Sequence, residues 1–132
     1  MFQKVIKRKL TVGHADLTAA VNGTAQTINI GQKPPTGSRL LTRELTGITQ
    51  FTGGSASSCT LDIGGTDADA IVAAENVLGG GTVNRQGTSG VNPGGDYGGQ
   101  QLTATFTPDA SHTLAGLTAG AVTITLTFIR VK

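Results

Sequence analysis

The chain ends with the stretch that decides its fold, AVTITLTFIRV at residues 121–131. Apolar residues alternate with threonines there: Val122, Ile124, Leu126 and Phe128 on one side, Thr123, Thr125 and Thr127 on the other. A period of two is the pattern of a strand with one buried and one exposed face. Residues 100–107, QQLTATFT, repeat the pattern with Leu102, Ala104 and Phe106. The last third of the chain therefore predicts two half-buried strands.

Further strand patterns lie upstream. Residues 2–12 predict a strand preceded by, or continuous with, an extended arm, and residues 24–30 alternate cleanly. Residues 39–51 form a longer strand pattern, with Leu41 and Leu45 on one side and Leu40 on the other. Because only a short Gly-containing break separates that segment from residues 59–63, we expect the two to pair as adjacent antiparallel strands.

Two segments predict other structure. Residues 67–78 are the helix candidate, because Asp67 can cap and apolar residues recur at helical spacing. Residues 14–20 suggest a short helical or irregular piece, and the connection at 108–120 should tuck Leu114 and Leu117 inward. Residues 79–99 form a long Gly-rich segment of the kind that is usually functional or disordered.

These elements predict an all-β protein, an antiparallel β-sandwich that is jelly-roll-like and has one short helix. We expect residues 1–12 to form a basic arm or strand and residues 13–132 a single domain. The predicted core follows the period of two and contains eight residues: Cys59, Leu61, Ile63, Leu102, Phe106, Ile124, Leu126 and Phe128.

The composition favours a structural role. Only 14% of the 132 residues are charged, against about 25% in ordinary globular chains. Gly and Thr are abundant instead, which suits a surface that packs against other subunits. The net charge of +2 is too small to indicate specific nucleic-acid binding. The sequence contains no apolar run of membrane-spanning length and no signal-peptide pattern, so we expect a soluble protein made in the cytoplasm.

Residues for catalysis or metal binding are scarce. His14 and His112 lie in different connections, and Cys59 lies on the apolar side of a strand. The acidic residues Asp62, Asp67 and Asp69 favour helix capping over a calcium site, because the rest of a calcium loop is missing. We therefore expect no catalytic residue, no metal and no cofactor, and the protein is predicted not to be an enzyme.

Six residues are candidates for an interface: Lys4, Lys7, Arg8, Lys9, Asp96 and Tyr97. The basic run favours an interaction arm, although lysines also protect strand edges from pairing. Tyr97 could anchor an interface from its loop or fold back onto the sandwich. We expect residues 1–9 to add a strand to a neighbour's sheet, so that deleting them weakens binding more than folding.

Four segments of the chain resemble small virion proteins of tailed bacteriophages: HADLTAA at residues 14–20, AQTINI at 25–30, SCTLDIG at 58–64 and LTAGAVTI at 117–124. The resemblance covers most of the chain. Such proteins are commonly head decoration, or cement, proteins that sit on the capsid lattice and stabilise it.

The resemblance implies a virion protein on the capsid surface that binds the major capsid protein of the same virion. It also implies a homo-oligomer, for example a trimer. The alternatives are a tail, neck or fibre component, including one with a carbohydrate-binding fold. The aromatic content of 4% and the absence of Trp disfavour a sugar platform.

Overall fold

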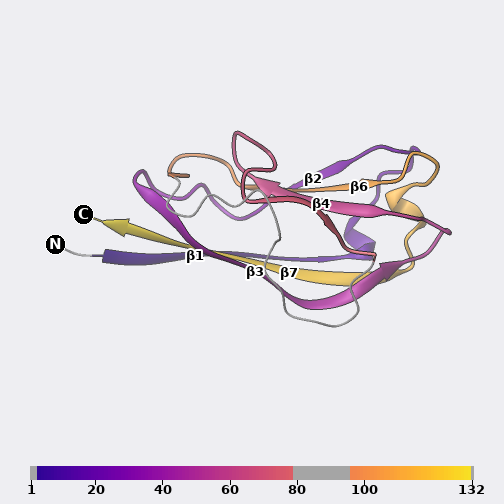
Figure 1. Ribbon diagram of the computed structural model, residues 1–132, viewed down its shortest axis with the longest axis horizontal. Helices are drawn as coiled ribbons and strands as arrows, with labels where there is room; N and C mark the ends of the chain where they lie inside the picture. Colours follow the sequence, from indigo (N-terminus) through magenta and orange to yellow (C-terminus); the bar gives the residue numbers. More distant parts are fainter. Residues whose placement is uncertain (1–2, 79–95, 132) are drawn as a thin grey trace.

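The computed structural model describes residues 3–78 and 96–131, which form two antiparallel β-sheets packed face to face (Figure 1). Sheet A has the strand order β1-β7-β3 and contains β1 (Gln3–Gly13), β3 (Ser38–Thr52) and β7 (Ala119–Val131). Sheet B has the order β2-β6-β4-β5 and contains β2 (Gln26–Asn29), β4 (Cys59–Gly64), β5 (Val72–Asn76) and β6 (Thr103–Pro108). The predicted antiparallel sandwich is confirmed.

Strand β7, which contains the alternating stretch at residues 121–131, is the central strand of sheet A. It pairs with β1 from Gln3↔Val131 to Gly13↔Ala121 without a register shift, and with β3 on its other side. Pairing on both sides satisfies its main-chain hydrogen bonds, while its period of two sends alternate side chains to the core. The two termini of the described chain consequently lie side by side at one end of the sandwich (Figure 1).

The core lies between the sheets. All eight residues predicted for it are buried, and so are Leu114 and Leu117 in the connection before β7. Phe51 of β3 and Phe106 of β6 contact each other across the sheets, with ring centroids 5.9 Å apart. The connections contribute two 3-10 turns, η1 (His14–Asp16) and η2 (Leu114–Gly116). The period of two thus identified the part of the core that comes from β4, β6 and β7.

The predicted helix at 67–78 is wrong. Residues Val72–Asn76 form strand β5, which pairs antiparallel with β4. A tight turn precedes it, where the carbonyl of Asp67 accepts from the N–H groups of Gly65 and Ala70. Ile71, Val72 and Val77 are fully buried. Their β-branched side chains fit a pleated sheet better than a helix, and the apparent helical spacing arose from a short strand interrupted at Ala74, whose φ is +53°.

The expected pairing of residues 39–51 with residues 59–63 is also wrong. Strand β3 belongs to sheet A and β4 to sheet B, so the connection crosses from one sheet to the other. Gly53, Gly54 and Ser55 all have positive φ, and the chain passes through them to sheet B instead of forming a hairpin with β3. A Cβ at Gly53 would lie 2.4 Å from the backbone nitrogen of Thr118, so only glycine fits this crossing.

Residues 3–12, expected to form an arm or a strand, lie within β1. Ile6 and Val12 of this strand are buried. The segment at 3–9 therefore belongs to the edge strand of the protein's own sheet, and its pairing with a neighbour's sheet stays a prediction. Deleting it would remove core contacts as well as lysines. Residues 1–2 and most of the Gly-rich segment, 79–95, lie outside the described residues.

Candidate interaction surface

The four candidate cations of β1 have different surroundings. Lys4, Lys7 and Lys9 are exposed, and the β1–β7 register places Lys7 opposite Thr127 and Lys9 opposite Thr125. The threonines that alternate with the buried residues of β7 point away from the core, so Lys7 and Lys9 share that outer face of sheet A. They are available for contacts with another molecule.

Arg8 is used inside the molecule. Its Nε donates to the carbonyl of Gln32 at 2.8 Å, its Nη1 to the carbonyl of Lys7 at 3.0 Å, and its Nη2 to the carbonyl of Lys33 at 3.4 Å. The guanidinium thereby ties β1 to the turn between β2 and β3. Arg8 is a structural cation, whereas its three lysine neighbours are surface cations.

Tyr97 folds back onto the sandwich. Only 4% of its surface is exposed, and its ring packs edge-on against Phe128 with the centroids 6.3 Å apart. Its N–H donates to the carbonyl of Ser38 at 3.0 Å. Burial raises the pKa of its hydroxyl, and the charge of Asp67 adds to the effect. Tyr97 therefore presents no aromatic anchor at the surface.

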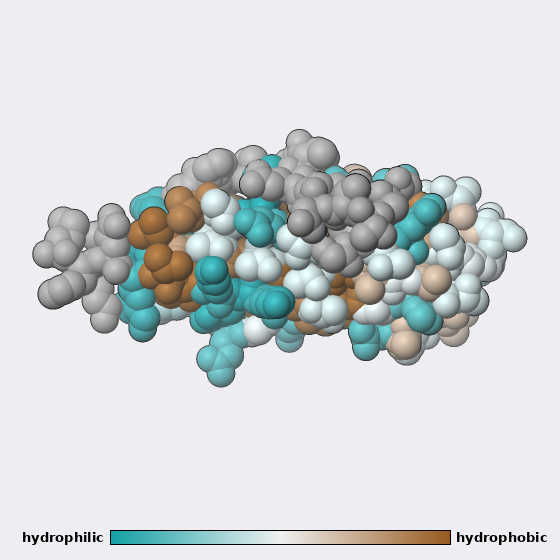
Figure 2. Space-filling view, turned by 90° about the horizontal axis from the view of Figure 1, so that it is seen from below, coloured by the Kyte–Doolittle hydropathy of each residue, from teal (hydrophilic) through white to brown (hydrophobic). Residues whose placement is uncertain are grey.

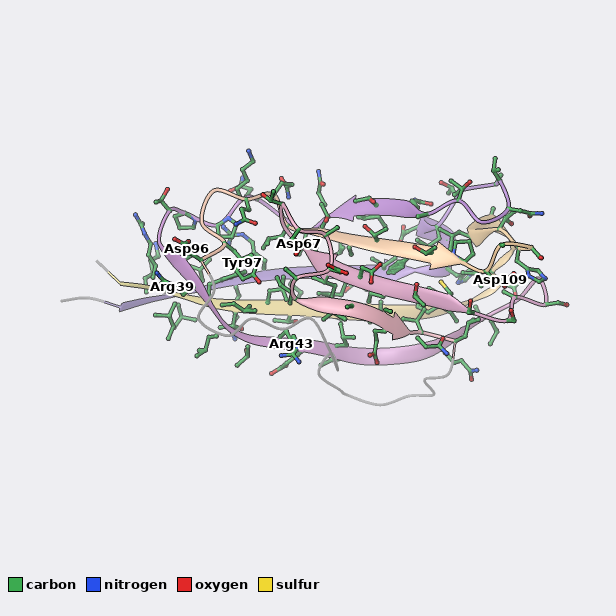
Figure 3. The ribbon with its side chains drawn as sticks, turned by 45° about the horizontal axis from the view of Figure 1, so that its top comes forward. Arg39, Arg43, Asp67, Asp96, Tyr97 and Asp109 are labelled. Carbon is green, nitrogen blue, oxygen red and sulfur yellow. The ribbon has the colours of Figure 1, made fainter. Side chains whose placement is uncertain are left out.

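Asp96 is exposed and forms an isolated antiparallel bridge with Arg39 of β3 (Figure 3). Its carboxylate accepts from the N–H of Gly98 at 2.9 Å, which closes a local turn. Because β3 and β1 are the opposite edges of sheet A, Asp96 and the lysines of β1 are separated by β7. The six candidate residues therefore do not form one site.

An apolar patch on the outer face of sheet A was not predicted from the sequence. Val5 is 59% exposed and Leu41 is 50% exposed, and Ile129 lies opposite Val5 in the register. Figure 2, which views this face, shows hydrophobic surface gathered at the end near the chain termini. A β-bulge between Leu40 and Thr42 turns Leu41 outward while Leu40 stays buried, so the simple alternation expected along β3 is broken.

A second missed feature is the separation of charge between the sheets. All lysines and arginines in the described strands belong to sheet A: Lys4, Lys7, Arg8, Lys9, Arg39, Arg43 and Arg130. The strands of sheet B contain none, and the turn between β4 and β5 adds Asp67 and Asp69. The sequence already shows that most basic residues lie before residue 44 or near the C-terminus. Only the strand order shows that these two segments belong to the same sheet.

The titratable residues considered for chemistry have local structural roles. The Asp109 carboxylate contacts Nδ1 of His112 at 2.5 Å and accepts from the N–H groups of Ser57 and Ser111. These bonds, chiefly the one to His112, hold the pKa of Asp109 well below its usual range. Burial raises the pKa of the Cys59 thiol to about 11. Among the described residues, no group of three or more His, Cys, Asp or Glu is arranged to hold a metal ion.

Two shallow hollows flank the open side of β1. One of about 320 Å³ is lined by Lys4, Val5, Ile6, Lys7, Arg8 and Pro35. The other, of about 300 Å³, lies between β1 and β2 and is lined by Leu10, Thr11, Val12, Asp16, Gln26 and Ile28. Neither brings together an acid, a base and a nucleophile, so both are features of an open sheet edge.

Comparison with known proteins supports the fold. The fold resembles that of a chain in the structure of the cyanophage Pam1 capsid asymmetric unit. The two chains superpose with a TM-score of 0.65 at 15% sequence identity, over 98% of this chain and 86% of the Pam1 chain. The crystal structure of FLHE superposes with a TM-score of 0.53 at 7% identity, over 98% of both chains. No protein-family model and no curated protein matches the sequence.

None of the helical segments among the described residues has the length and apolar character required to cross a bilayer.

Proposed function

We propose that this protein is a non-enzymatic structural subunit of a tailed-phage virion, and specifically a decoration or cement subunit on the capsid surface. The observation that carries the proposal is the similarity of nearly the whole chain to a chain of the Pam1 capsid, at a TM-score of 0.65. The low content of charged residues, 14%, agrees with a surface made for contact with other subunits.

The mechanism is stabilisation by preferential binding. A subunit that binds the assembled capsid lattice and not the separated capsid proteins shifts the equilibrium toward the assembled state. At a free concentration 100 times the Kd, each occupied site contributes about 2.7 kcal/mol. The partner in this proposal is the major capsid protein of the same virion, and the chain acts as a homo-oligomer such as a trimer. No cofactor or catalytic step is involved.

The test uses heads of the phage that encodes this chain, assembled without it. Purified protein is added, and bound protein is measured by co-sedimentation together with the temperature at which the heads release DNA. Saturable binding and a higher release temperature are the expected result. Absence of binding to heads, combined with binding to purified tails, would contradict the decoration role and favour a tail, neck or fibre component.

A further inference from the structure

We propose that the outer face of sheet A is the docking face, and that it recognises an acidic protein surface with an apolar spot at one end. This inference rests on the proposed function, since it names the surface with which the subunit would bind the virion. It places sheet B, which has no lysine or arginine in its strands, on the side away from the partner.

The first observation is the charge on that face. Lys7 and Lys9 lie on it beside the threonines of β7, and the exposed Arg39 lies opposite Ile129 on the other side of the strand. Glu44, opposite Thr125, is the acidic residue of this face among the described residues. The described part of the face is therefore rich in hydroxyl groups and net positive. Charges of this kind steer an oppositely charged partner and fix its orientation.

The second observation is that the apolar patch belongs to the same face. Val5, Leu41 and Ile129 sit at the end of the sheet where β1 begins and β7 ends, with Lys7 and Arg39 next to them in the register. An apolar centre with charged neighbours is the usual composition of a protein–protein interface. Lysines that only protect a strand edge would not require exposed Val5 and Leu41 beside them.

A second copy of the chain fits this face less well than a different protein. Acidic groups on the sheet B side are buried or engaged locally. Glu75 of β5 is buried, an Asp62 oxygen of β4 accepts from the N–H of Ala74 at 2.6 Å, and hydrogen bonding to Asp67 raises the pKa of Asp69. Asp67 and Asp69 lie on the turn between β4 and β5 and not on the strands. Stacking sheet A of one copy on sheet B of another would place the lysines mainly opposite neutral Thr and Asn side chains.

Nucleic acid also fits less well. Binding of single strands uses exposed aromatic side chains for stacking, and all four aromatic residues that the structure describes, Phe51, Phe106, Phe128 and Tyr97, are buried. The apolar patch would have no complement on a phosphate backbone. An acidic protein surface is the partner that uses both the cations and the patch.

The experiment compares three variants for binding to DNA-free heads. Lys7→Gln/Lys9→Gln removes two charges from the docking face, and Val5→Ser/Leu41→Ser removes the apolar patch. Thr103→Glu/Thr107→Glu is the matched control, because it makes the same change in net charge on the outer face of sheet B. Thermal unfolding of each free protein, measured alongside, confirms that all three remain folded.

We expect the lysine variant to bind about five- to tenfold more weakly at low salt, with the difference fading as salt screens the charges. The Val5/Leu41 variant should bind about tenfold or more weakly at every salt concentration. The control should bind like the wild type. Equal binding by the lysine variant and the wild type, or an equal loss in the control, would overturn the proposal. Loss of self-association with unchanged head binding, or binding only when DNA is present, would also overturn it.

Failure of this inference is distinguishable from failure of the proposed function. If the wild type does not bind heads at all, the decoration role fails. The proposal that sheet A is the docking face is then tested by acetylating intact virions and mapping the modified lysines. Protection of Lys7 and Lys9, while the exposed Lys33 on the β2–β3 turn reacts, supports the face wherever the subunit sits. Equal reaction of all three lysines, or absence of the chain from virions, overturns it.

Discussion

Tyr97 lies edge-on against Phe128 inside the sandwich, with ring centroids 6.3 Å apart, although it follows a Gly-rich segment. The contact brings the chain after residue 95 back onto the core at the end where β3 begins. Tyr97 is therefore a core residue. The neighbouring Asp96 forms a backbone β-bridge with Arg39 at the edge of sheet A (Figure 3).

The hydroxyl of Tyr97 gives the first prediction. Its oxygen is buried and has no hydrogen-bond partner in the structure as described. A buried polar atom without a partner costs about 1–3 kcal/mol. We expect Tyr97→Phe to be at least as stable as the wild type in urea unfolding, whereas Tyr97→Ala should lose about 3–5 kcal/mol of unfolding free energy. A clearly less stable Tyr97→Phe would show that the hydroxyl has a partner.

The second prediction concerns the contact between the sheets. Phe106 is fully buried and packs against Phe51. Replacing Phe106 by Ala should lower the free energy of unfolding by about 3–5 kcal/mol through lost contacts and the resulting cavity. Thr105→Ala, on the outer face of the same strand, is the control and should lose about 1 kcal/mol or less, since it removes only the exposed hydrogen bond to Thr27. Similar losses in the two variants would show that β6 is not oriented as described.

The sequence predicted a strand correctly where apolar and polar residues alternate along it without interruption. Strands β6 and β7 alternate without interruption, and every core residue taken from them is buried. Prediction failed where backbone geometry departs from the period. The bulge at Leu41 exchanges the inward-facing and outward-facing positions of β3 after that residue. In β5, the irregular backbone at Ala74 places the buried residues Val72 and Glu75 three positions apart, which is a helical spacing. No local pattern contains that information.

The candidate surface was predictable only in part. Lys7 and Lys9 were identified from the basic run, but the patch of Val5, Leu41 and Ile129 comes from three strands that are distant in sequence. Strand order depends on packing across the whole domain, so pairing partners could not be read from any one segment. The same reason explains why the sequence left open whether residues 1–12 form an arm or a strand, whereas Gln3–Gly13 form the strand β1.

The third prediction concerns the reactivity of Cys59. The thiol is fully buried, and burial raises its pKa to about 11 from the usual 9.0. Thiolate is the reactive form, so an aromatic disulfide reagent at pH 8 should label the native protein slowly and the urea-unfolded protein at once. Because the folded state holds the proton more tightly, stability should be constant below about pH 9 and decline as the pH rises toward 11. Rapid labelling of the native protein would contradict the burial.

The fourth prediction concerns acid stability at the Asp109 turn. The pKa of Asp109 is held below its usual range, first by His112 and then by the N–H of Ser57. A depressed pKa contributes stability above the pKa of the unfolded chain, and this contribution is lost as the pH falls through the lower folded value. Asp109→Asn should therefore flatten the loss of stability below about pH 4. Thermal unfolding across that range measures it, and a variant with the wild-type acid profile would show that the turn makes no contribution.

We propose that this chain is a capsid subunit that docks through sheet A. Cryo-electron microscopy of the native virion, at a resolution that places individual strands, tests it most directly. We predict the sandwich on the outside of the head, with β1, β7 and β3 facing an acidic surface of the capsid protein and sheet B facing solvent. Finding the chain in the tail or neck, or with sheet B against the capsid, would contradict this proposal.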